Sequence, residues 1–265
     1  MKSSLDRNML NFWIDKDKKV EAAHLLDLCA RALKGPDPVV TPFLGLGMKN
    51  WLENILQGAD LHHLGWGGFD HAERVRFALD ANETELCCDR TDVALIEAAP
   101  LKKGCVLGHR DVLGSLLGLG LEREVIGDIR QTAGGAVVAV TKPIEEYILQ
   151  HWLSVGRESI RAARFDPDSV VLPAGGLEKR IVSASARLDG VAAAAFGISR
   201  SAMQDYIRQG RVKKNDLVIT KPDGEVEAGD ILSCRGEGRV KILQEDVKTR
   251  KGRSAWRIFI YQDRK

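Results

Sequence analysis

Residues 187–215 read RLDGVAAAAFGISRSAMQDYIRQGRVKKN, and this stretch decides the fold of the C-terminal third of the chain. Ser199 can begin a helix, because its hydroxyl can accept a hydrogen bond from a free N–H group of the first turn. Met203, Tyr206 and Ile207 recur at helical spacing and predict a buried apolar stripe along that helix. The stretch therefore predicts a short amphipathic helix that starts directly after Ser199.

Basic side chains gather on and after this predicted helix. Gly210 follows the last turn, where a residue in the left-handed conformation often ends a helix. The cations that lie off the apolar stripe, or directly after the helix, are Arg200, Arg208, Arg211, Lys213 and Lys214. A buried seam with a cationic outer face suits the phosphate backbone of a nucleic acid.

This part of the chain resembles the S4-type RNA-binding domain. The matching positions are Arg187-Leu188-Asp189, Ser199-Arg200-Ser201, Ile207, Gly210, Val212, Asn215, Gly229-Asp230 and Arg235-Gly236. The resemblance implies a helix–helix–hairpin unit that grips structured RNA with its second helix and the adjacent strands. Lys214 and Asp216 stand where that family usually has Val and Gly, so a less regular turn is expected at Asn215. Ala192 replaces a larger apolar residue, which predicts a smaller core under the first helix.

The cationic pattern and the resemblance together predict the RNA-binding residues. They are Arg187, Ser199, Arg200, Ser201, Gln204, Arg208, Arg211, Lys213, Lys214, Asn215, Arg235, Gly236 and Arg239. Within this set, Ser199, Arg200, Lys213, Arg235 and Arg239 are expected to hold phosphates. Main-chain N–H groups at the start of the second helix would assist them.

The charge of the chain is divided unevenly. Residues 179–265 hold 19 Lys and Arg against 11 Asp and Glu, a net charge of +8, whereas the rest holds 20 and 26, a net charge of −6. A basic end on an acidic body predicts a polyanionic partner bound at that end. A basic face that contacts only solvent would explain the charge by itself. However, the S4-like stretch lies in the same part of the chain, and this coincidence favours a polyanionic partner.

Composition places the chain among ordinary globular proteins. It has 265 residues, of which 44% are hydrophobic and 29% charged, and this length suits two or three domains. No apolar run is long enough to span a membrane, and the N-terminus lacks the apolar core of a signal peptide. Five cysteines without framework spacing predict free thiols rather than disulfides. We expect a cytoplasmic monomer.

The first 80 residues predict a small, mainly helical domain. Helices are expected at 16–33, 49–56 and 70–79, with a short strand at 61–66 between the second and the third. Gly35-Pro36 ends the first helix.

Residues 81–180 predict a second domain with the order β-α-β-β-α-β. The expected strands and helices lie at 93–96, 112–121, 125–131, 136–140, 144–152 and 159–165. This split arrangement closes a four-stranded sheet with two helices on one face, as in ferredoxin-like and RNA-recognition-motif domains. However, the third strand, 135–140, has none of the aromatic residues on which RNA-recognition motifs stack bases. The fold class is therefore α+β, with an S4-type third domain at 181–265.

Several further segments complete the predicted order. Residues 166–177 contain two prolines and two glycines and predict a linker, and 179–185 predict a strand that still belongs to the middle domain. In the last domain, strands are expected at 217–220, 231–235, 240–244 and 256–261. The basic segment 248–253 predicts a hairpin tip that adds phosphate contacts.

The second unusual stretch, 107–130, reads LGHRDVLGSLLGLGLEREVIGDIR. His109-Arg110-Asp111 invites a comparison with protein kinases, but the metal-binding Asn is replaced by Leu116 and no Asp-Phe-Gly follows. Gly118 and Gly120 do not complete a dinucleotide-binding fingerprint. Four glycines, Gly108, Gly114, Gly118 and Gly120, predict that a helix packs closely on the sheet. Arg123 and Asp128 are placed to cap or pair.

This stretch resembles the YlmH family, whose members in photosynthetic lineages are also called photosystem II S4 domain proteins. The matching pieces are His109-Arg110-Asp111, Leu113-Gly114, Leu117-Gly118-Leu119-Gly120, Arg123 and Ile126-Gly127-Asp128-Ile129, with Gly67-Gly68-Phe69 and Ala72-Glu73-Arg74 earlier in the chain. Together with the C-terminal match, the resemblance spans nearly the whole chain.

Membership of this family implies a non-enzymatic protein without cofactor or metal that binds rRNA or tRNA on the large ribosomal subunit. It implies ribosome-associated quality control on stalled peptidyl-tRNA and, in photosynthetic organisms, a link to photosystem II biogenesis. Two interpretations of the 109–128 stretch stay open: maintenance of the fold, and a secondary RNA or ribosome contact through His109, Arg110 and Arg123.

Two other classes of function compete with this one. S4-like units also occur on RNA-modifying enzymes, namely pseudouridine synthases and RNA methyltransferases, but usually at the N-terminus of a large catalytic domain. The signatures of tyrosyl-tRNA synthetases, which carry the unit at the C-terminus, are absent. The second competing class is a metal site, since His62, His63 and His71 precede Cys87-Cys88. The spacing of these residues, however, is not that of known ligand sets.

Overall fold

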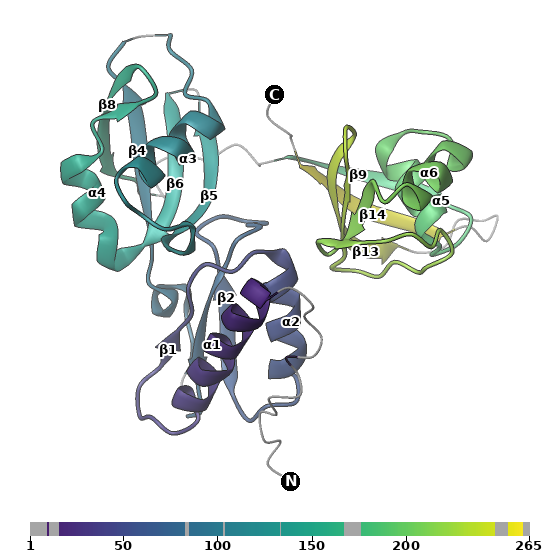
Figure 1. Ribbon diagram of the computed structural model, residues 1–265, viewed down its shortest axis with the longest axis horizontal. Helices are drawn as coiled ribbons and strands as arrows, with labels where there is room; N and C mark the ends of the chain where they lie inside the picture. Colours follow the sequence, from purple (N-terminus) through teal and green to yellow (C-terminus); the bar gives the residue numbers. More distant parts are fainter. Residues whose placement is uncertain are drawn as a thin grey trace. The chain divides into compact units, whose positions relative to one another are not determined.

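The computed structural model describes residues 10, 16–82, 85–102, 104–132, 134–166, 176–246 and 254–261. The chain forms two compact units, Met1–Pro173 and Ala174–Lys265 (Figure 1). Both units combine helices with antiparallel sheets, and the predicted α+β class is confirmed. The predicted linker at 166–177 and the basic hairpin tip at 248–253 lie largely or wholly outside the described residues.

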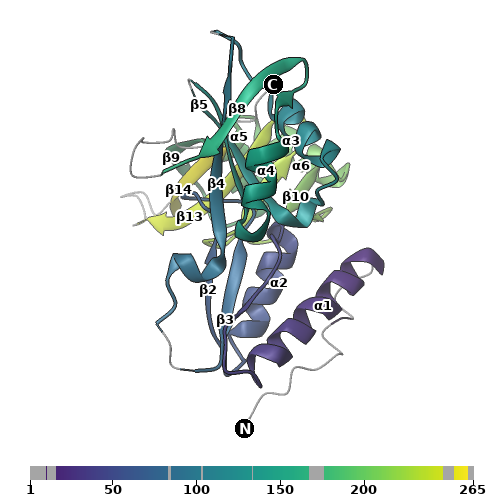
Figure 2. The same ribbon diagram turned by 90° about the vertical axis from the view of Figure 1, so that its left-hand side faces the viewer.

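The N-terminal part of the first unit packs two helices on a three-stranded sheet (Figure 2). The helices are α1 (Lys16–Ala32) and α2 (Leu46–Leu56), and the strands are, in spatial order, β1 (Val39–Val40), β3 (Arg76–Asp80) and β2 (His62–Trp66). Leu25 from α1, Leu52 from α2 and Phe77 from β3 are almost fully buried in the shared core. The expected helices at 16–33 and 49–56 and the strand at 61–66 are confirmed.

The helix predicted at 70–79 is wrong, because residues 76–80 form β3, the central strand of this sheet. All five of its residues are buried, and it pairs with β1 on one side and β2 on the other. The Arg76 guanidinium donates to the carbonyl oxygens of Thr41 at 2.8 Å, Thr91 at 2.8 Å and Asp92 at 2.6 Å. Sheet pairing and this buried arginine override the local sequence pattern that suggested a helix.

The middle part of the first unit has the predicted order β-α-β-β-α-β (Figure 1). Its strands are, in spatial order, β5 (Ile126–Thr132), β6 (Gly135–Thr141), β4 (Val93–Pro100), β8 (Glu158–Arg164) and the two-residue β7 (Ser154–Val155). The helices α3 (His109–Gly118) and α4 (Glu145–His151) pack against the same sheet through Val112, Leu116 and Ile148, all fully buried.

The other face of this sheet is covered by the N-terminal part of the same unit. Phe43 and Phe69 pack on Val137 and Ala139 of β6. Gly127 allows this approach, because an added Cβ would lie 2.6 Å from Phe43 Cε1 and 2.9 Å from the Ala139 Cβ. The strand without aromatics is therefore a packing surface, and the base-stacking route of RNA-recognition motifs is closed here.

The expected close packing of α3 through its glycines is wrong. A Cβ at Gly114, Gly118 or Gly120 would meet no atom within 4 Å, and all three residues are exposed. The buried side of α3 is formed by Val112 and Leu116 instead. Helical periodicity places those two residues on the face opposite Gly114 and Gly118.

The second unit is a six-stranded antiparallel sheet with two helices. The spatial order of the strands is β11 (Leu217–Val218), β10 (Val212–Lys214), β12 (Ile231–Cys234), β13 (Gly238–Asp246), β14 (Ser254–Tyr261) and β9 (Gly176–Ser183). Residues of α5 (Leu188–Phe196) and α6 (Arg200–Arg208) share one core with one face of this sheet. The strand predicted at 179–185 exists as β9, but it pairs with β14 and not with the middle part of the first unit. Trp256 Nε1 donates to Ser183 Oγ at 2.9 Å across this pairing.

Candidate nucleic-acid interface

The helix predicted from the opening stretch is α6, and it forms for the predicted reasons. Ser199 Oγ accepts a hydrogen bond from the Ala202 N–H at 3.2 Å and caps the first turn. Met203 and Ile207 are fully buried, whereas Ser201 is exposed on the first turn. The N-cap and the buried stripe thus fix which side of α6 meets solvent.

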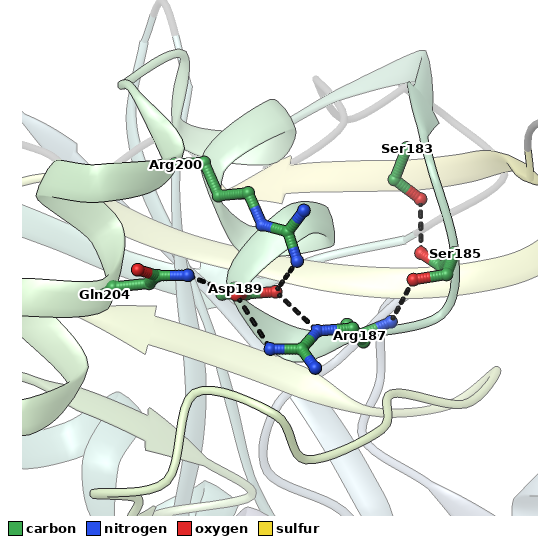
Figure 3. Close-up of polar contacts among 6 residues, drawn as sticks. All are labelled: Ser183, Ser185, Arg187, Asp189, Arg200 and Gln204. Atoms are coloured by element: carbon green, nitrogen blue, oxygen red, sulfur yellow. Dashed lines mark hydrogen bonds and ion pairs between the residues drawn. The ribbon is translucent and has the colours of Figure 1, made fainter.

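The buried carboxylate of Asp189 organises the predicted cations around the starts of α5 and α6 (Figure 3). Arg187 donates to it through Nε at 3.3 Å and Nη2 at 3.2 Å, and Arg200 donates through Nη2 at 2.9 Å. Gln204 adds a hydrogen bond from Nε2 at 2.7 Å. Asp189 itself is fully buried. One carboxylate therefore holds three side chains, one from the N-cap position of α5 and two from successive turns of α6.

The ionisation of Asp189 is stabilised by these contacts. Burial raises the pKa of this carboxyl, but the hydrogen bonds from Arg187, Arg200 and Gln204 outweigh burial and hold the pKa of Asp189 well below its usual range. The side chains of Arg187 and Arg200 remain 42% and 48% exposed. Because a guanidinium carries five N–H donors, each arginine can still donate to an acceptor that arrives from solvent.

Lys214 and Asn215 hold the hairpin between β10 and β11. Lys214 Nζ lies 2.8 Å from Asp230 Oδ2, and Asn215 Nδ2 donates to Asp230 Oδ1 at 2.8 Å. Asn215 and Asp216 both have positive φ, 53° and 66°, and Lys214 pairs with Leu217. These are the marks of a regular two-residue type I′ turn, so the expected irregularity is wrong. Asn and Asp are the non-glycine residues that best tolerate this conformation.

The predicted RNA-binding residues do not share one face of the sheet. Val212, Leu232 and Val240 are fully buried in the core on the helix side. Because side chains alternate along a strand, Lys213 and Arg239 lie on the opposite side. Arg187, Ser199, Arg200, Ser201 and Gln204, which belong to or adjoin the helices, lie on the helix side.

The remaining predicted residues of this unit gather at the end of α6 and at the β12–β13 turn. Arg211 stacks on Tyr206, with its guanidinium carbon 3.6 Å from the ring centre, and donates to the Arg235 carbonyl at 2.7 Å. Gly236 has a φ of 94°, which this turn requires. Arg235 is exposed, and the exposed Arg208 pairs with Asp205 at 3.1 Å.

Asp128 in the first unit connects its N-terminal and middle parts, and Arg123 holds the neighbouring segment 126–127. Asp128 accepts hydrogen bonds from the main-chain N–H groups of Glu73 at 2.7 Å and Arg74 at 3.2 Å. Arg123 donates to the carbonyls of Ile126 at 2.5 Å and Gly127 at 3.2 Å. Burial, together with the nearby Arg74 guanidinium, lowers the pKa of Arg123 to about 10. These contacts support the interpretation of fold maintenance for this pair of residues.

His109 and Arg110 begin α3 on the same unit. His109 is half-buried and Arg110 is exposed. Among the described residues, no group of three or more His, Cys, Asp or Glu side chains is placed to hold a metal ion. No helix in the described ranges is long and apolar enough to cross a membrane.

The sequence prediction of the site missed the organising role of Asp189. The available signal was an acidic residue at the start of the otherwise apolar segment 188–196. It also missed Arg180, Lys241 and Arg257, which lie on the same side of the sheet as Lys213 and Arg239.

Comparison with known proteins gives three matches to family models, in chain order. Residues 17–84 match the model described as "YlmH, N-terminal", residues 90–168 match "Putative RNA-binding domain in YlmH", and residues 186–232 match the S4 domain. A relative from Bacillus subtilis (strain 168), "Ribosome-associated protein quality control protein P2", is 29% identical over 220 residues, which is 83% of this chain and 85% of the relative.

A solved structure also resembles the chain. "Cell division protein ylmH from Streptococcus pneumoniae" is 17% identical, with a TM-score of 0.52. The match covers 59% of this chain and 96% of that one. This likeness supports the fold of the matched part.

Proposed function

The chain belongs to the YlmH family, and from this premise we propose that it is a non-enzymatic protein that binds structured RNA of the ribosome. The observation that carries the proposal is the Asp189 cluster, in which a buried carboxylate holds the partly exposed Arg187 and Arg200 at the starts of α5 and α6. Fixed guanidinium groups next to the free N–H groups of a helix start are suited to phosphate oxygens.

The target that we propose is rRNA or tRNA on the large ribosomal subunit, in ribosome-associated quality control. The name of the Bacillus subtilis relative supports the ribosome and quality control as parts of this proposal. In this proposal the domains predicted at 1–80 and 81–180 position the S4 unit, with His109 and Arg110 as a secondary contact. The protein acts as a cytoplasmic monomer, and in photosynthetic organisms the same activity supports photosystem II biogenesis.

The test is cosedimentation with purified large ribosomal subunits. The decisive variant is Ser201→Glu, because an acidic residue in the first turn of α6 favours the helix dipole but repels phosphate. We expect the wild-type protein to sediment with the subunits and this variant to bind at least about tenfold more weakly. Ser201→Gln is the matched neutral control and should lose much less affinity than Ser201→Glu, because it adds no negative charge.

Three results would contradict the proposal. Wild-type protein that stays in the supernatant would show that the large ribosomal subunit is not the target. Full binding by Ser201→Glu would show that RNA does not bind at the start of α6. Modified nucleosides in RNA incubated with the protein, with or without a methyl donor, would favour the alternative of an RNA-modifying enzyme.

A further inference from the structure

The face of the six-stranded sheet opposite α5 and α6 carries a band of cations. The register of the strands places on this face Lys213 of β10, Arg239 and Lys241 of β13, Arg257 of β14 and Arg180 of β9, which we call the sheet-side cations. It also places two acidic residues there, Glu178 of β9 and Asp246 of β13. The sheet-side cations run diagonally from β10 to β9, across four strand intervals. At about 4.8 Å per interval, the band is roughly 19 Å wide.

Two of these cations are held by a carboxylate in the same manner as the Asp189 cluster. Asp246 Oδ2 accepts from Arg180 Nε at 3.2 Å, and Asp246 Oδ1 lies 3.7 Å from Arg257 Nη2. A hydrogen bond from Gln244, with the two arginines nearby, keeps the pKa of Asp246 below its usual range. The Arg180 and Arg257 side chains are 57% and 48% exposed, so both can meet a ligand.

Arg239 is oriented by neighbouring polar atoms. Its Nε donates to Ser233 Oγ at 3.0 Å, and its Nη2 lies 3.8 Å from Asp216 Oδ1. Lys213 pairs across the strands with Ser233, which pairs in turn with Arg239, and the Lys213 side chain is exposed. The band thus combines oriented guanidinium groups with an exposed ammonium group, and both kinds of cation bind phosphate.

The rest of this face is suited to contact with charge rather than with apolar groups. Phe259 and Tyr261 lie in the middle of it but are only 1% and 9% exposed, so they cannot stack on bases. Within the described strands, the exposed large apolar side chains on this face are Val182 and Val218, which lie on the two edge strands β9 and β11. A membrane-inserting or apolar protein partner would need a contiguous apolar patch.

We propose that the sheet-side cations form a second RNA-contact surface, which takes the phosphate backbone of an RNA segment distinct from the one bound at the Asp189 cluster. This inference rests on the proposed function and deepens it. The two surfaces lie on opposite sides of one sheet, so a single short duplex cannot cover both. The S4 unit would therefore join two RNA segments, and its binding to the ribosome would require both surfaces.

A bridging assay with RNA duplexes tests this inference. A 12-base-pair RNA duplex is immobilised, the full-length protein is added, and retention of a second, fluorescent 12-base-pair duplex is measured. The sheet variant is Lys213→Gln with Arg180→Gln and Arg257→Gln, all at exposed side chains. The helix variant is Arg200→Gln with Ser201→Glu. Thermal melting of each variant controls for folding.

We expect the wild-type protein to bind the immobilised duplex and to retain the second one. The sheet variant should still bind one duplex but lose the second, with a fall in affinity for that second duplex on the order of 100-fold at about 0.1 M salt, since three phosphate contacts disappear. The helix variant should likewise hold one duplex and fail to bridge.

The outcomes separate this inference from the proposed function. If the sheet variant bridges as the wild type does, or if the helix variant loses all RNA binding, the second surface is refuted and the first one stands. If the wild-type protein binds no RNA, both are refuted. If the sheet variant differs from the wild type only in binding to phosphatidylserine vesicles, the band serves a lipid surface and the RNA inference is wrong.

Discussion

Asp189 Oδ1 lies 2.9 Å from Arg200 Nη2, although the aspartate is fully buried and the arginine side chain is 48% exposed. The pair therefore joins the core of the second unit to its surface. A buried charge without partners is costly, so the fold itself requires a cation at this place. In the proposed function, the same requirement fixes where an incoming phosphate would find a guanidinium group, so that stability and recognition would be coupled at one residue.

Asp189→Asn should lower both stability and RNA affinity. The amide keeps the shape of the side chain but removes the charge that orients Arg187 and Arg200. We expect a loss of about 2–4 kcal/mol in the free energy of unfolding, measured by urea denaturation, because charged hydrogen bonds in a buried network are lost. RNA affinity should fall at least about tenfold. Unchanged affinity in the folded variant would show that the arginines need no positioning.

Acid should destabilise the second unit through Asp189 and Asp246. The pKa of each carboxyl is lowered in the folded state. Each group therefore contributes stability that is fully present above its unfolded pKa of about 4 and is lost as the pH falls through the folded pKa. Urea unfolding between pH 6 and pH 2 should show stability falling below about pH 5. In Asp189→Asn the free energy of unfolding should fall less steeply with decreasing pH. An equally steep fall in that variant would contradict the role assigned to Asp189.

Two glycine substitutions should have opposite effects on the first unit. Gly127→Ala would bring a Cβ within 2.6 Å of Phe43 Cε1, so we expect a loss of about 1–3 kcal/mol in unfolding free energy. Gly114→Ala, in the exposed face of α3, meets no atom within 4 Å and should stabilise by about 0.5–1 kcal/mol. Thermal or urea unfolding checks both. Equal effects would mean that the β6 face is not packed against Phe43 as described.

RNA binding should depend steeply on salt. If about six phosphates are neutralised, the logarithm of the affinity should fall with the logarithm of salt concentration with a slope of about −4. Arg200→Gln should reduce the magnitude of that slope by about 0.7, since one contact is lost. Fluorescence anisotropy at several salt concentrations measures the slope. Arg31→Gln, at an exposed cation of α1, is the matched control, and a salt-independent affinity would overturn the electrostatic account.

Much of the fold follows from local patterns. The helices α1 and α6 were predictable because apolar spacing and end residues such as Ser199 act within a single segment. The order β-α-β-β-α-β was predictable because the apolar residues of each segment recur with the spacing of a helix or of a strand. The central strand β3 was not, because it is defined by two partners that lie at 39–40 and 62–66 in the sequence. The membership of β9 in the last sheet likewise depends on a pairing with residues 254–261.

The sequence by itself determined that the last third is basic, that α6 has a cationic side, and that the chain resembles the YlmH family. Tertiary structure alone decided which cations act together. A strand turns successive side chains to opposite faces, and pairing in register then brings Lys213, Arg239 and Arg257 onto one face from three strands. Helix packing places Arg187 and Arg200 around Asp189 on the other. The surface that we propose for RNA is thus set by pairing and burial, which act between segments far apart in the chain.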